Sequence, residues 1–173
     1  MHRTANSCLY RAFGAEACVA YNPDLPISAQ RGAFPAEIPG AVVVAHSFGF
    51  AAFIAARASG LLRNAARLIV IDGFYPLDRT WAGRDITIEL PSDCPCIFFF
   101  PSFGDRSRYP LEAVVRQAMI TRLDLTVVRG IGFGHNLLYG SFKEPDVCSL
   151  VARLAALPDT RESEADIAIH MPQ

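Results

Sequence analysis

Ser47 stands between a valine-rich run at residues 41–45 and an alanine-rich segment at residues 48–59. This pattern predicts a buried strand, a tight turn at the serine, and a helix that begins directly after it. Such a turn requires small residues two positions before and two positions after the serine, and Ala45 and Gly49 occupy these positions. The turn lifts the hydroxyl above the sheet edge, where N–H groups of the helix N-terminus stabilise an oxyanion. The pattern therefore predicts a nucleophilic serine.

The segment Ala45-His46-Ser47-Phe48-Gly49 resembles the nucleophile elbow of the α/β-hydrolase superfamily, G-x-S-x-G, with alanine in place of the first glycine. It is similar to the elbows of many esterases and thioesterases. The resemblance covers most of the chain and implies a catalytic order of serine, acid and histidine. It also implies that the backbone N–H of Phe48 donates to the oxyanion. A second donor would have to come from residues 1–6, because no strand is predicted before the helix at residues 4–15.

The resemblance places the catalytic histidine at His135, after the glycine-rich stretch 129–134. This stretch follows the strand predicted at residues 125–128 and is expected to be a loop. A flexible loop of this kind brings the imidazole over Ser47, where it serves as general base and then as general acid. The neighbouring His46 occupies the variable position of the elbow and is expected to be structural.

Two aspartates compete for the role of the acid, which fixes the imidazole tautomer and stabilises the imidazolium. Asp105 follows the strand predicted at residues 96–100, on the loop where most of the superfamily places its acid. Asp72 follows the strand predicted at residues 68–71, where some thioesterases of the superfamily place it. We favour Asp105 at this stage and keep Asp72 as the alternative.

Aromatic side chains gather on the loops that follow the predicted strands, which is the edge where open α/β sheets bind ligands. They favour an apolar or aromatic acyl group as the substrate. The residues expected to contact it are Phe74, Tyr75, Trp81, Phe103 and Phe133.

Five short apolar runs predict strands that are buried on both faces, as in a parallel sheet covered by helices. Helical segments alternate with these runs, which predicts an α/β fold. The resemblance implies a three-layer α/β/α sandwich with a mostly parallel sheet, reduced N-terminal strands and no large cap, since residues 73–95 are too few for one. The predicted strands are residues 17–21, 41–45, 68–71, 96–100 and 125–128, and the predicted helices are residues 4–15, 48–59, 111–123 and 146–157.

The chain has 173 residues, which favours one domain, here residues 1–157, followed by a polar, frayed tail at residues 158–173. The 16 basic and 17 acidic residues leave a net charge of −1, which argues against a nucleic-acid partner. The mean hydropathy of +0.24 is high. However, the longest apolar stretch, residues 41–56, is too short to span a membrane. Without a clear signal peptide, we expect a cytoplasmic protein.

The sequence contains five cysteines, an odd number that favours buried thiols in a reducing compartment. Cys94 and Cys96 are separated by one residue, not by the two residues of a zinc or redox pair. No phosphate-binding or zinc motif is present. We therefore expect no metal and no organic cofactor.

These observations together predict a serine hydrolase that cleaves an ester or thioester of an apolar or aromatic acyl group through an acyl-serine intermediate. One alternative is a thioesterase or acyltransferase that acts on a carrier-bound acyl chain with Asp72 as the acid. The other alternative is a catalytically silent α/β-hydrolase-like protein that binds a ligand or a partner.

Overall fold

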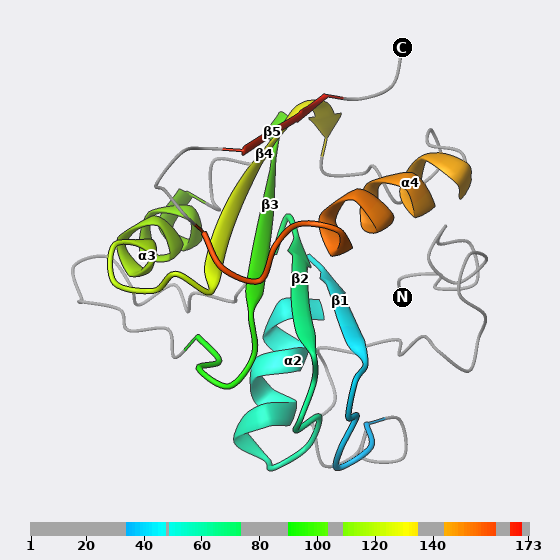
Figure 1. The fold of residues 1–173 in the computed structure, drawn as a ribbon, viewed down its shortest axis with the longest axis vertical. Coiled ribbons are helices and arrows are strands. Elements are labelled where there is room, and N and C mark those ends of the chain that lie inside the picture. Colours follow the sequence, from blue (N-terminus) through cyan, green and yellow to red (C-terminus); the bar gives the residue numbers. More distant parts are fainter. Residues whose placement is uncertain are drawn as a thin grey trace.

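A computed structural model of the chain describes residues 34–47, 49–73, 90–103, 109–134, 144–161 and 167–170. The described residues form a five-stranded sheet whose strands all run parallel and stand side by side in chain order (Figure 1). The strands are β1 (Val42–His46), β2 (Arg67–Ile71), β3 (Cys96–Phe103), β4 (Leu125–Gly134) and β5 (Ile167–His170), and the helices are α2 (Gly49–Ala58), α3 (Tyr109–Met119) and α4 (Glu144–Ala155). The expected α/β fold with a parallel sheet is confirmed, whereas the elements expected at residues 4–15 and 17–21 lie outside the described residues.

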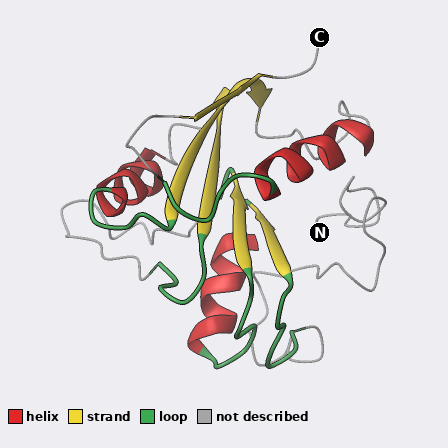
Figure 2. Cartoon of the chain, in the orientation of Figure 1, coloured by secondary structure: helices red, strands yellow, loops and turns green. Residues whose placement is uncertain are grey.

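Helices cover both faces of the sheet (Figure 2). Successive side chains of a strand point to opposite faces, so each strand contributes to two separate apolar clusters. Val70 and Phe98 pack in the cluster that contains side chains of α2 and α3. Ile69 and Phe99 pack in the cluster that contains side chains of α4. This double burial explains why the central strands have continuous apolar runs instead of an alternating pattern.

The glycine-rich stretch before His135 is part of β4, so the expectation of a loop there is wrong. β4 continues to Gly134 and pairs with both β3 and β5 along this stretch. The reason lies at Gly130, where a Cβ would stand 2.2 Å from Cζ of Phe99. The Phe99 ring covers the bare backbone of this glycine, and the missing side chain allows the close approach.

The tail after α4 contains a strand, which corrects the expectation of a frayed end for Ile167–His170. β5 is a short edge strand in which Ile169 is buried and His170 is exposed. Because only one face of β5 is buried, it has no continuous apolar run. Arg161 also holds the tail, since its backbone N–H donates to the Leu123 carbonyl oxygen at 2.8 Å.

Among the described residues, no helix has the length and apolarity that crossing a membrane requires.

Arg67, the first residue of β2, fastens the last turn of α4 to the sheet. Its guanidinium donates to the carbonyl oxygens of Leu154 and Ala155, at 3.5 and 2.6 Å, and pairs with Asp159. Carbonyl groups at a helix C-terminus lack intrahelical partners, and a cation there satisfies them. The Arg67 side chain is only 10% exposed, so its hydrogen bonds are shielded from water.

We expect Arg67→Met to lower the free energy of unfolding by about 1–3 kcal/mol, because it leaves partly buried carbonyl groups without a donor. Arg63→Met is the matched control. Arg63 pairs with Glu37 at 3.0 Å, but both side chains are more than half exposed. The control should change stability by about 0.5 kcal/mol or less. Urea unfolding followed by circular dichroism measures both, and equal losses would contradict the role given to Arg67.

Candidate functional site

Ser47 occupies a strained turn between β1 and α2. Its φ angle is 53°, in the left-handed region that residues with a Cβ rarely adopt. The Ser47 N–H donates to the Ile71 carbonyl oxygen at 3.1 Å, and the Ser47 carbonyl oxygen accepts from the Phe50 N–H at 3.1 Å. The first bond ties the turn to β2 and the second ties it to the first turn of α2. The strained turn that the sequence predicts at this serine is therefore present.

Small residues make room for this turn. A Cβ placed on Gly49 would lie 3.9 Å from Cβ of Ala45, at ordinary van der Waals distance. Any longer side chain at either position would press on the other, because Ala45 is 4% exposed and fully enclosed. The alanine that replaces the first glycine of the motif thus fits against Gly49 without displacing the turn.

Asp72 lies at the same level of the sheet edge as Ser47. His46 pairs with Ile71 across β1 and β2, so the next residue of each strand, Ser47 and Asp72, leaves the sheet at the same height. Asp72 is 1% exposed, and its φ angle of 43° is also left-handed. Its backbone N–H donates to the Phe99 carbonyl oxygen at 2.8 Å. Two adjacent strands therefore end on strained polar residues, and such strain clusters at functional sites.

Gly73 is a part of this edge that the sequence analysis did not single out. A Cβ on Gly73 would stand 2.4 Å from Cγ1 of Val70 and 3.3 Å from Cβ of Phe50. The chain thus leaves β2 against the first turn of α2, where only glycine fits. The signal in the sequence is the Asp-Gly pair directly after an apolar run, which marks a turn.

His135, Asp105 and Phe48 lie outside the described residues. The described residues nearest to Asp105 and His135 in the chain are Phe103 of β3 and Gly134 of β4, and these two residues pair with each other. Asp105 follows two residues after this pair and His135 follows one residue after it. The sheet thus brings the chain positions next to the predicted acid and base to the same edge.

That end of β3 extends beyond the level of Ser47. Ile71, the last residue of β2, pairs with Phe99, and β3 continues for four more residues to Phe103. At about 3.3 Å per residue, β3 projects roughly 13 Å further along the strand direction than β2 does. The backbone of Asp72, which follows the shorter strand β2, lies level with Ser47.

Most of the residues predicted to contact substrate are not described. Phe74, Tyr75 and Trp81 lie outside the described residues, and Phe103 is placed only by its backbone in β3. Phe133 is 2% exposed and packs edge-on against Phe99, with ring centroids 5.2 Å apart. The structure places Phe133 in the core beneath α4.

In the described part of the chain, no group of three His, Cys, Asp or Glu side chains could hold a metal ion.

Comparison of the chain with protein-family models, with curated proteins and with solved structures finds no match in any of the three. The assignment of a function therefore depends on the geometry at Ser47 and Asp72.

The strain at Ser47 predicts an unusual order of stability for two variants. Ser47→Gly should be more stable than Ser47→Ala by about 1 kcal/mol, because glycine adopts the left-handed conformation without a steric penalty. At Ser59, which is exposed and has no positive φ angle, the order should be reversed. Thermal or urea unfolding of the four variants tests this, and the same order at both positions would contradict the strain.

Proposed function

We propose that this chain is a serine hydrolase of the α/β-hydrolase type, with a three-layer arrangement, that transfers an acyl group from an ester or thioester to water. The observation that carries the proposal is the φ angle of 53° at Ser47, between a parallel strand and a helix. A serine held in this way presents its hydroxyl above the sheet edge instead of burying it in the turn. An ordinary turn would use glycine or asparagine at such an angle, because a serine there costs about 1 kcal/mol or more.

In the proposed reaction, Ser47 Oγ attacks the acyl carbon while His135 takes the hydroxyl proton. The backbone N–H of Phe48 and the N-terminus of α2 stabilise the negative charge on the acyl oxygen. His135 then gives the proton to the leaving alcohol or thiol, which leaves an acyl-serine. Water activated by the same imidazole releases the acid and restores Ser47.

The position of Asp72 supports the thioesterase alternative, in which Asp72 and not Asp105 is the acid. A carboxylate orients the imidazole best when it is shielded from water and held in place. Asp72 is 1% exposed, its backbone N–H is bonded to β3, and it stands level with Ser47 on the next strand. We therefore reverse the preference drawn from the sequence and propose Asp72 as the acid. A carrier-bound acyl chain then remains a substrate class alongside small esters.

The activated serine is tested with a fluorophosphonate probe followed by intact-mass measurement. The folded wild type should take up one probe molecule, and Ser47→Ala should take up none. Ser59→Ala, which changes an exposed serine after α2, should label like the wild type. A folded wild type that does not label would contradict the proposal and favour the catalytically silent alternative.

The acid is tested by Asp72→Asn and Asp105→Asn, measured as the rate of probe labelling. Asparagine keeps the shape of aspartate and tolerates the left-handed backbone at position 72. We expect Asp72→Asn to slow labelling by roughly 10⁴-fold, because the imidazole loses the carboxylate that orients it. Asp105→Asn should leave the rate within a few-fold of the wild type. The opposite result would assign the acid to Asp105 and remove the support for the thioesterase alternative.

A further inference from the structure

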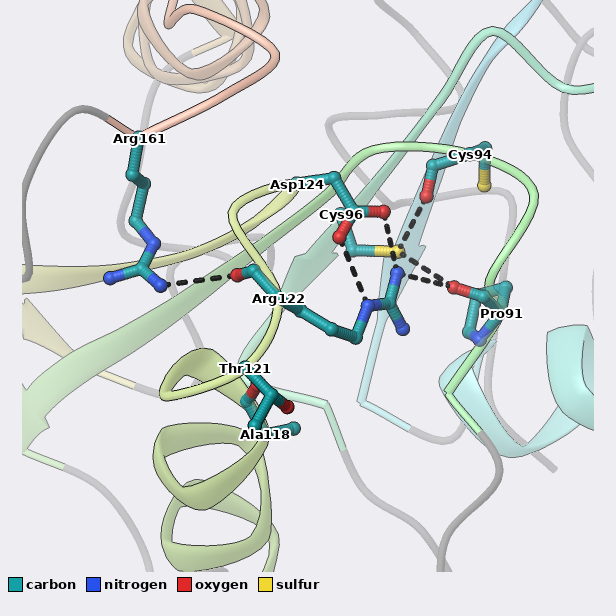
Figure 3. Close-up of polar contacts among 8 residues, drawn as sticks. All are labelled: Pro91, Cys94, Cys96, Ala118, Thr121, Arg122, Asp124 and Arg161. Carbon is teal, nitrogen blue, oxygen red and sulfur yellow. Dashed lines mark hydrogen bonds and ion pairs between the residues drawn. The ribbon is translucent and has the colours of Figure 1, made fainter.

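Cys94 and Cys96 lie at the amino end of β3 (Figure 3). Ser47 follows the carboxyl end of β1, which runs parallel to β3, so the cysteines are at the opposite edge of the sheet. Both side chains are buried, at 3% and 0% exposure, and both belong to the apolar cluster beneath α2 and α3. The proposed hydrolase chemistry uses neither of them. The two thiols therefore form a pair of reactive groups, one residue apart, to which the proposed function assigns no role.

The Cys96 thiol lies against the backbone of Cys94. Cys96 Sγ donates to the Cys94 carbonyl oxygen at 3.3 Å and lies 3.9 Å from the Pro91 carbonyl oxygen. A disulfide needs Cα atoms about 4.4–6.8 Å apart. Two residues of fully extended chain span about 6.6 Å, and the bend at Cys94 shortens this span. The spacing therefore lets the two sulfur atoms bond without unfolding β3.

Two arginines hold the segment that carries the thiols. Arg57, from the last turn of α2, forms an ion pair with Asp93. Arg122 donates to the Pro91 carbonyl oxygen at 2.8 Å. Each of these guanidinium groups also pairs with a carboxylate, Arg57 with Asp93 and Arg122 with Asp124, so ion pairs surround the thiols and hold the segment in place.

The surroundings make the two cysteines unequal. The neighbouring Cys96 side chain lowers the pKa of Cys94, in spite of burial and of the nearby Asp93 carboxylate, which both raise it. The charges of Arg57 and Arg122 have smaller effects that also lower it. The neighbouring Cys94 side chain and burial raise the pKa of Cys96. Cys94 is therefore the thiol that ionises first, and Cys96 stays protonated beside it.

We infer that Cys94 and Cys96 form a thiol–disulfide exchange site whose partner is a low-molecular-weight disulfide. The Cys94 thiolate attacks one sulfur of the disulfide, which forms a mixed disulfide and releases the first small thiol. The Cys96 thiol then gives up its proton, attacks the Cys94 sulfur, and releases the second small thiol. The protein loses two electrons and two protons, and the small disulfide is reduced to two thiols.

Access to the thiols requires the segment 90–95 to move outward, because both sulfur atoms are enclosed. The segment is held by the Arg57–Asp93 ion pair, by the hydrogen bond from Arg122 to the Pro91 carbonyl oxygen, and by the Leu68 N–H, which donates to the Pro95 carbonyl oxygen at 2.9 Å. Asp93 is 44% exposed, so the ion pair is partly screened by solvent and contributes little to stability. The small disulfide therefore reacts with a locally opened form while the sheet stays intact.

Glutathione disulfide is the probe for this site. The folded Ser47→Ala variant is incubated with it, quenched by alkylation and digested with trypsin, so that the hydrolase activity plays no part. The tryptic peptide of residues 85–106 contains Cys94 and Cys96 and no other cysteine. We expect this peptide to lose the mass of two hydrogens and both alkylation sites. Two free thiols after the incubation, or a mixed disulfide that does not resolve, would overturn the inference.

Variants separate the attacking thiol from the resolving thiol. Cys96→Ala should retain one glutathione on Cys94, because no second thiol is present to release it. Cys94→Ser should carry no glutathione in this peptide, because the pKa of Cys96 is raised. Cys148→Ser changes a half-buried cysteine of α4 and should leave the disulfide in the peptide unchanged. Glutathione on Cys96 in Cys94→Ser, at the rate seen on Cys94 in Cys96→Ala, would overturn the assignment of roles. If a variant does not fold, the Ser47→Ala measurement alone decides.

Discussion

Burial of β2 on all sides is the constraint on which the described structure depends. Every residue of this strand is buried, including the arginine at its start. Its two neighbours in the sheet, β1 and β3, are fixed in register by its backbone, and its alternate side chains enter the two apolar clusters. One end of the strand fastens α4 through Arg67, and the other end carries Asp72 beside Ser47. A shift of one residue in β2 would exchange the two clusters and move both ends at once.

Strained backbone occurs at the carboxyl ends of β1 and β2 and in the return that leads into β2. Ser47 and Asp72 stand at the carboxyl edge of the sheet, while Leu62 and Asn64, with φ angles of 55° and 62°, stand in the return before β2. The return is held by hydrogen bonds, since Arg57 donates to the Leu62 carbonyl oxygen at 2.9 Å. At the carboxyl edge, the backbone bonds of Ser47 and Asp72 to neighbouring strands have the same effect. Surrounding contacts thus fix conformations that the residues alone would avoid.

The sequence predicted β1, β2 and α2 to within one residue at each end, because their apolar runs are continuous and their limits are marked by Ser47 and Gly60. It missed β5 because Ile167 and Ile169 alternate with exposed residues, and four residues are too few for a clear period. It took the glycines of β4 for a loop because the ring that covers Gly130 comes from another strand.

For the candidate site, the turn at Ser47 follows from local spacing. The height of Asp72 relative to Ser47 depends on the register between strands, which one sequence does not encode locally. Likewise, the burial of Phe133 against Phe99 is a contact between strands.

The order of the strands in space is the order of the strands in the chain. Each described strand after β1 pairs with the strand that precedes it in the chain. Each of these strands can therefore form its first pairing before the later strands are present. A chain that leaves the ribosome from its N-terminus can therefore enlarge the sheet one strand at a time, with each new strand added to an edge that is already formed. The sequence separations within each pairing are short compared with the whole chain, which keeps the entropy cost of each addition low. Synthesis and assembly of this sheet can proceed in the same direction.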